Sequence, residues 1–152
     1  MADDATTRHD PHDLARFVEA QAADYERALA EVRAGRKRSH WMWYVFPQFE
    51  GLGSSPMARQ YAIKSVDEAR AYLEHPLLGP RLREIAGAAL GIEGRDASAI
   101  FGPPDDMKLR SCVTLFAAVS PEGSVFHRLL DKFFQGRGDE RTLRLMAAAS
   151  KG

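Results

Sequence analysis

The chain has 152 residues, of which 45% are hydrophobic and 28% charged, and this composition is typical of one globular domain. Lysine plus arginine and aspartate plus glutamate number 21 each, so overall charge gives no reason to expect a nucleic-acid partner. The single cysteine, Cys112, excludes an internal disulfide and a cysteine-rich zinc site.

The first nine residues are polar and acidic, and we expect residues 1–9 to form a flexible tail before a single domain at residues 10–150. They do not have the apolar core of a signal peptide. No apolar run approaches the roughly 20 residues that a membrane-spanning helix needs. We therefore expect a cytoplasmic protein with no membrane partner.

Residues 36–49 are the most distinctive segment, because three basic residues, a serine and a histidine lead directly into an aromatic run with both tryptophans. A long helix precedes it: Asp10 and Pro11 are typical of a helix start, apolar residues follow at spacings of three and four, and Gly35 would end the helix. Ser39 could then cap a short helix that Pro47 ends. The alternative for the aromatic run is a buried strand, since periodicity does not separate the two.

Further helices are predicted along the rest of the chain. Ser65 and Glu68 match a capping box that opens a helix to His75, and apolar spacing predicts helices over about 78–91, 103–119 and 125–136. Asp139 would cap a last helix. Because no segment alternates apolar and polar residues, the sequence predicts an all-α fold, a single compact domain of six to eight helices with no significant sheet.

Several sequence words resemble a family of small bacterial proteins of unknown function that is sometimes mislabelled calpastatin. The matching words, spread over about residues 14–145, are Arg16-Phe-Val-Glu-Ala-Gln21, Gly35-x-Lys37-x-x-His40-Trp-Met-Trp-Tyr-Val-Phe-Pro-Gln48, Gly51-Leu-Gly53, Tyr61-Ala-Ile63, Tyr72-Leu-x-His-Pro-x-Leu-Gly79, Ile100-Phe-Gly102, Asp105-Asp-x-Lys-Leu-x-Ser-Cys112 and Thr114-Leu-Phe116. The resemblance implies a mainly helical fold. It implies no activity, substrate or catalytic residue.

The segment at 36–48 is the first candidate ligand site. Backbone N–H groups at a helix start favour anions, and cations of residues 36–38 would add positive charge. Indole faces could stack a planar group, and a histidine can transfer a proton near neutral pH, which makes His40 the candidate catalytic residue. The candidate ligand-binding residues here are Lys37, Ser39, His40, Trp41, Trp43 and Gln48. The competing interpretation is structural: the tryptophans would be core residues, and the cations would lie at a helix C-terminus, where the dipole favours them.

A second candidate group lies at the start of the 103–119 helix, where Asp106, Lys108 and Ser111 could contribute to the same pocket. The two aspartates at 105 and 106 are also explained by helix stabilisation, because acidic residues are favoured in a first turn. Lys108, Ser111 and Cys112 share a helix face, so the lysine could activate a neighbouring nucleophile. No known nucleophile motif surrounds these residues.

The leading hypothesis is a pocket for a small anionic, phosphorylated or nucleotide-like ligand. We expect no metal and no cofactor, since histidines and carboxylates do not cluster at recognised spacings and the glycines match no phosphate-binding or dinucleotide motif. The alternative hypothesis is a non-enzymatic protein-interaction module with a purely structural aromatic segment, whose partner docks on the helix with His127 and Phe134. Whether the protein is an enzyme stays open.

Overall fold

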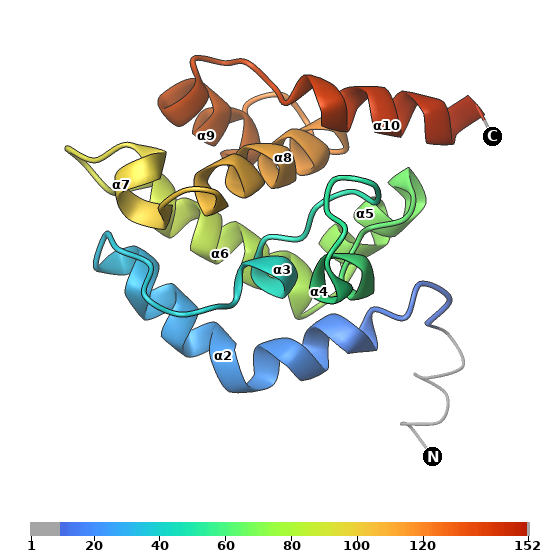
Figure 1. Ribbon diagram of the computed structural model, residues 1–152, viewed down its shortest axis with the longest axis horizontal. Coiled ribbons are helices and arrows are strands. Elements are labelled where there is room, and N and C mark those ends of the chain that lie inside the picture. The colour runs from blue at the N-terminus through green and yellow to red at the C-terminus, as the bar shows by residue number, and fades with distance from the viewer. Residues whose placement is uncertain (1–9, 152) are drawn as a thin grey trace.

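The computed structural model describes residues 10–151, with side chains for residues 10–149, and within these residues the chain forms nine α-helices and no sheet (Figure 1). The all-α prediction is confirmed. The helices exceed the expected six to eight because three of them are single turns, and two of these were not predicted. The expected tail at residues 1–9 lies outside the described residues. The helices are α2 (Ala15–Arg33), α3 (Met42–Val45), α4 (Pro56–Gln60), α5 (Val66–Glu74), α6 (Leu78–Leu90), α7 (Ala97–Phe101), α8 (Asp105–Ala118), α9 (Val125–Phe134) and α10 (Glu140–Lys151).

The long helix α2 has the predicted register but starts later than expected. Asp10 does cap it, yet across an intervening turn: its two carboxylate oxygens accept from the N–H groups of Leu14 (2.7 Å) and Ala15 (3.0 Å). At the other end Gly35 has a φ of +78°, a conformation that glycine adopts without strain. The N–H of Arg36 donates to the Glu31 carbonyl at 3.0 Å, which closes α2 and reverses the chain.

Helices α5 and α10 start at the residues that local capping signals indicated. The Ser65 hydroxyl accepts from the Glu68 N–H at 3.0 Å at the start of α5, and Asp139 accepts from the Thr142 N–H at 2.9 Å at the start of α10. Helix α7, which we did not predict, is capped by Asp96, which accepts from the Ala99 N–H at 2.8 Å. These contacts satisfy N–H groups that have no partner inside their own helix.

A chain of aromatic rings ties four helices together in the core. Phe17 of α2 meets Tyr72 of α5 with ring centres 5.1 Å apart, and Tyr72 meets Phe116 of α8 at 5.4 Å. Phe116 in turn meets Phe126 of α9 at 5.8 Å. All four residues are at most 1% exposed, so the hydrophobic and aromatic contacts that fix the helices relative to one another are shielded from water.

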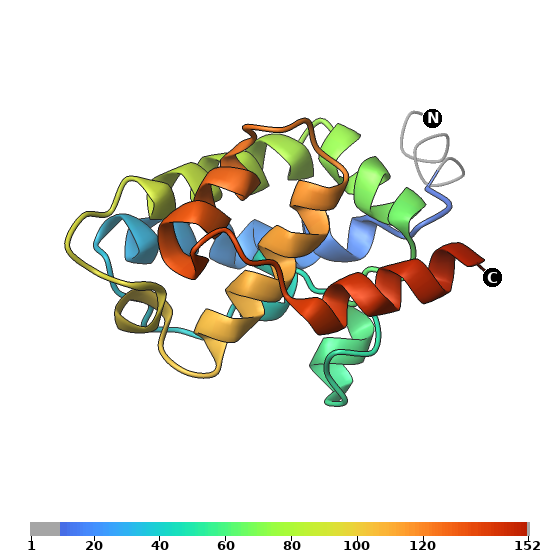
Figure 2. The same ribbon diagram turned by 90° about the horizontal axis from the view of Figure 1, so that it is seen from above.

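Helix α2 lies along one side of the molecule and α8, α9 and α10 along the other, with α6 passing between them (Figure 1). Seen from above, α10 runs beside the segment that leads to α4 (Figure 2). A parallel bridge between Phe49 and Ile63 closes the base of that segment. No helix among residues 10–151 has the length and apolar content to cross a membrane.

Candidate functional site

The turn between α2 and α3 folds around the carboxylate of Glu31. One oxygen of Glu31 accepts from the N–H groups of Arg38 (2.7 Å) and Ser39 (3.0 Å) and from the indole N–H of Trp41 (2.9 Å), and the other accepts from the Ser39 hydroxyl. Ser39 therefore does not cap α3, which begins at Met42 without a side-chain cap. The N–H groups where we expected an external anion already bind a carboxylate of the chain itself.

Partial burial of Glu31 acts to raise the pKa of its carboxyl group. The hydrogen bonds from Ser39, Arg38 and Trp41 outweigh burial and lower this pKa to about 2. At neutral pH Glu31 is therefore ionised, and its negative charge offsets the partial positive charges of the N–H groups that point at it. It also leaves Trp41, only 1% exposed, with a partner for its indole N–H.

Lys37 belongs to the same framework. Its side chain is 6% exposed, and its ammonium lies 2.8 Å from Asp105 Oδ2, donates to the Ser39 carbonyl at 2.5 Å and lies 4.9 Å from the Trp41 ring centre. These contacts use most of the donors of one ammonium group. Lys37 thus joins the turn to α8 and orients Asp105, and little of its hydrogen-bonding capacity is left for a ligand.

The aromatic run is mostly core. Trp41, Met42, Tyr44 and Phe46 are buried, whereas Trp43 is only partly buried. Against the expectation that it would line a pocket, Trp41 has its ring in the core and its indole N–H bonded to Glu31. The buried-strand alternative is wrong, since this segment is the one-turn helix α3.

Two hollows adjoin Trp43. The first has a volume of about 370 Å³, opens beside residues 37–40 and the start of α8, and is named the cationic hollow. The second has a volume of about 430 Å³, opens between residues 52–55, α8 and the start of α10, and is named the serine hollow. The cationic hollow is lined by Lys37, Arg38, Ser39, His40, Met42, Trp43, Phe101, Pro103, Pro104, Asp105 and Lys108. The serine hollow is lined by Trp43, Gln48, Leu52, Gly53, Ser54, Ser55, Ala58, Pro104, Met107, Lys108, Ser111, Asp139 and Arg141.

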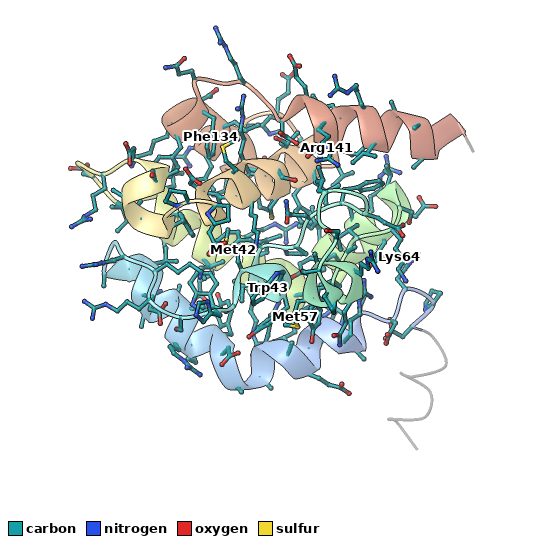
Figure 3. All side chains as sticks on the ribbon, in the orientation of Figure 1. Met42, Trp43, Met57, Lys64, Phe134 and Arg141 are labelled. Carbon is teal, nitrogen blue, oxygen red and sulfur yellow. The ribbon has the colours of Figure 1, made fainter. Side chains whose placement is uncertain are left out.

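Trp43, Pro104 and Lys108 line both hollows, which therefore form two parts of one cleft. Figure 3 shows Trp43 near the centre of the molecule, with Arg141 on the α10 side and Met57 of α4 on the other. A larger hollow of about 700 Å³ lies elsewhere, between the start of α2 and α5, and is lined by apolar and polar residues in equal number. None of the predicted site residues lines it.

Lys108 lies at the boundary between the two hollows. Its ammonium is 3.5 Å from Asp105 Oδ1 and 5.1 Å from the Trp43 ring centre, and its side chain is 26% exposed. Asp105 already pairs with Lys37 through its other oxygen. One carboxylate therefore serves two ammonium groups, and this part of the cleft carries an excess of positive charge.

The other predicted site residues divide between the hollows, with one exception. His40 is exposed and lines the cationic hollow, while Gln48 and Ser111 line the serine hollow. Ser111 is buried, and its hydroxyl lies 2.9 Å from that of Thr142, which joins α8 to α10. Asp106 is the exception: it lines neither hollow, and its carboxylate accepts from the N–H of Met107 at 2.9 Å.

The nucleophile considered on α8 is not assembled. Ser111 bonds to Thr142 rather than to Lys108. Cys112 is fully buried, and burial raises the pKa of its thiol well above the usual range, which disfavours the reactive thiolate. In the part of the chain that the structure describes, no three histidine, cysteine, aspartate or glutamate residues are grouped to hold a metal ion. His127 shares a 2.7 Å hydrogen bond with Ser124.

Sequence reasoning missed three contributors to the cleft: Glu31, the loop at 51–55 and Arg141. Glu31 had a usable signal: it lies about one helical turn before Gly35, where the helix ends and the basic residues begin. Because the chain reverses at Gly35, the residues that follow pass close to Glu31. The Gly51-Leu-Gly53 word marked the loop but not its role. Arg141 had no local signal, because it reaches the cleft only through the packing of α10 against α8.

The family model described as "Protein of unknown function (DUF1810)" matches residues 11–146. The chain belongs to this family. The DUF1810 match includes every residue of the cleft. The crystal structure of the conserved hypothetical protein Rv1873 from Mycobacterium tuberculosis is similar to this chain, with a TM-score of 0.89 and 55% sequence identity over 91% of this chain and 99% of that one. No curated protein matches the chain. The comparisons therefore establish family and fold, and they name no ligand.

Proposed function

We propose that this protein binds a small anionic, phosphorylated or nucleotide-like ligand in the cleft beside the Lys37–Gln48 segment. The observation that carries the proposal is the position of Lys108, between the two hollows and next to Trp43. Its carboxylate partner, Asp105, is closer to Lys37 (2.8 Å) than to Lys108 (3.5 Å). An incoming phosphate oxygen would complete the neutralisation of Lys108 through a charge-assisted hydrogen bond.

The charge of the cleft supports an anion although the chain as a whole is neutral. Among the described residues, four cationic side chains and two carboxylates line the two hollows. The cations are Lys37, Arg38, Lys108 and Arg141, and the carboxylates are Asp105 and Asp139. A cleft with one predominant sign of charge concentrates oppositely charged ligands. The partly exposed indole of Trp43 adds a flat apolar surface on which a planar group can stack.

A thermal-shift titration at low salt, with inorganic phosphate, ribose 5-phosphate, AMP and ADP, tests the proposal. A ligand at one hundred times its Kd stabilises the folded state by about 2.7 kcal/mol. For a chain of this size that corresponds to a rise in Tm of roughly 5–10 °C. Lys108→Gln should reduce the rise sharply. The matched control is Lys64→Gln, since Lys64 is exposed and lines neither hollow (Figure 3).

Two results would contradict the proposal. One is the absence of a Tm rise with every anionic probe at millimolar concentration. The other is an equal rise in wild type and Lys108→Gln, which would place the bound anion outside the cleft. The rise should also shrink as salt increases, because ions screen the attraction.

A further inference from the structure

The loop at 51–55 is held close to its neighbours by two glycines. A Cβ atom added to Gly53 would lie 2.6 Å from Cβ of Ala58 in α4, a separation that folded proteins do not tolerate. Gly51 has a φ of +100°, and an added Cβ would lie 3.3 Å from the Leu145 side chain of α10. The Arg141 guanidinium donates to the Gly51 carbonyl at 3.0 Å. Residues of α4 and α10 therefore fix the backbone of this loop where it borders the serine hollow.

This fixed loop has hydrogen-bond donors to spare. Within the described residues, the N–H groups of residues 52–55 donate to no protein atom, and the hydroxyl of Ser54 has no protein partner. The Ser55 hydroxyl accepts from the Ala58 N–H at 3.1 Å and keeps its own proton for another acceptor. A group of unused N–H and O–H donors at the edge of the serine hollow, which Lys108 and Arg141 also line, is suited to the oxygens of an anion.

The charges of the serine hollow complete this arrangement. Arg141 uses one of its five N–H donors on Gly51, and Lys108 also lines the hollow. Among the residues that the structure describes, Asp139 supplies the one carboxylate of this hollow. It accepts from the N–H and hydroxyl of Thr142 at 2.9 and 2.5 Å, so the start of α10 already engages it.

The cationic hollow is different. Lys37 is engaged with Asp105 and the Ser39 carbonyl, and the Asp105 carboxylate itself lines the hollow and repels an anion. Arg38 and His40 are exposed at its rim. This hollow suits the less charged part of a ligand, next to the Trp43 ring.

We infer that the serine hollow is the phosphate subsite of an organic phosphate, whose remaining part extends over Trp43 into the cationic hollow. The inference rests on the proposed function and specifies its ligand as a phosphate ester with an apolar or planar second part. Each hollow alone is near the lower limit of volume for ligand pockets, which usually measure roughly 300–1000 Å³. Their shared wall at Trp43 and Lys108 allows one ligand to occupy both.

Calorimetric titration of the full chain with inorganic phosphate and with AMP tests the assignment. Arg141→Gln should weaken inorganic phosphate and AMP roughly tenfold or more, because a charge-assisted hydrogen bond is lost. Arg38→Gln, at an arginine of the cationic hollow, should weaken inorganic phosphate far less than Arg141→Gln does. The matched control is Arg144→Gln, at an exposed arginine of α10 that lines neither hollow, and it should leave the affinity for inorganic phosphate unchanged. Because Arg141 also holds Gly51, a second variant is needed that disturbs no contact. Ser54 is exposed, and its hydroxyl has no hydrogen-bond partner among the described residues. Ser54→Asp should therefore abolish binding of inorganic phosphate without loss of a hydrogen bond, while Ser98→Asp, at an exposed residue of α7, should not.

The outcomes separate the two proposals. Suppose that wild type binds inorganic phosphate, and that Arg38→Gln lowers this affinity strongly while Arg141→Gln and Ser54→Asp leave it unchanged. The subsite assignment is then overturned, and the proposed function stands. If Ser54→Asp binds phosphate as wild type does, with an unchanged Tm, the assignment also fails. If neither inorganic phosphate nor AMP binds wild type, the proposed function fails, and the assignment fails with it.

Discussion

Replacing Glu31 by glutamine tests how the candidate cleft is built. The carboxylate accepts four hydrogen bonds from residues 38–41, and glutamine has one oxygen with which to accept them. Its NH₂ group would face the Ser39 hydroxyl, and its uncharged oxygen would accept weaker hydrogen bonds from the three N–H groups that one carboxylate oxygen now binds. We expect the variant to fold but to be clearly less stable than wild type.

The pKa of Glu31 sets the magnitude. A value of about 2 in the folded protein, against the ordinary 4.5, corresponds to ~3 kcal/mol at 1.36 kcal/mol per pH unit. Because the folded-state pKa is the lower one, this stabilisation is fully present above about pH 5. It decreases as the pH falls below 4.5 and is lost below pH 2. At pH 3 roughly half of it remains.

Urea denaturation followed by circular dichroism measures the difference. At pH 7 Glu31→Gln should lower the free energy of unfolding by about 2–3 kcal/mol, which is a midpoint shift of roughly 1–1.5 M urea at an m value of about 2 kcal/mol/M. The gap to wild type should narrow by about half at pH 3. The control is Glu26→Gln, at an exposed glutamate of the same helix. It should leave the free energy of unfolding at pH 7 and its dependence on pH unchanged. A gap below about 0.5 kcal/mol at pH 7, the size of an ordinary surface substitution, or a gap that does not depend on pH, would refute this account of the turn.

Two further predictions concern α6 and Cys112. Gly79→Ala should destabilise the fold by about 3 kcal/mol or more, because the added Cβ would lie 2.1 Å from the Leu73 carbonyl oxygen. Gly87→Ala on the same helix, where the added Cβ meets nothing within 4 Å, should be neutral or stabilise by up to about 1 kcal/mol; chemical denaturation measures both. Cys112 should react with a thiol reagent such as DTNB at pH 8 only slowly in the native protein and rapidly in urea, because it is fully buried and its thiol pKa is raised.

Equal stability of the two glycine variants would show that α5 and α6 can separate at Gly79 without cost. Rapid modification of Cys112 in native buffer, at a rate independent of urea, would mean that α8 opens readily to solvent.

The helices could be predicted because their signals are local. Apolar spacing placed α2, and the Ser65–Glu68 pair placed the start of α5. Helix α4 was missed although Ser55 followed by Pro56 is the same kind of start signal that we used at Asp10 and Pro11. The prediction failed at Ser39 because the competing partner, Glu31, comes from the preceding helix and reaches it only after the chain reverses at Gly35.

The site was only partly predictable for a related reason. Trp43, Gln48 and Lys108 were named from residue type and segment, and all three line the cleft. Which of two tryptophans faces the cleft depends on the rotation of a one-turn helix, which a four-residue segment does not encode. Arg141 depends on how α10 packs across α8, and that contact joins residues about 30 positions apart through Ser111 and Thr142.

The unequal burial of the two tryptophans makes the protein its own optical reporter. Trp41 is enclosed in the core and bonded to Glu31, so its emission reflects folding, while Trp43 lies on the wall that both hollows share. A quencher dissolved in water reaches the second indole and not the first. Fluorescence can therefore follow occupancy of the cleft and integrity of the core separately in one sample, without a label.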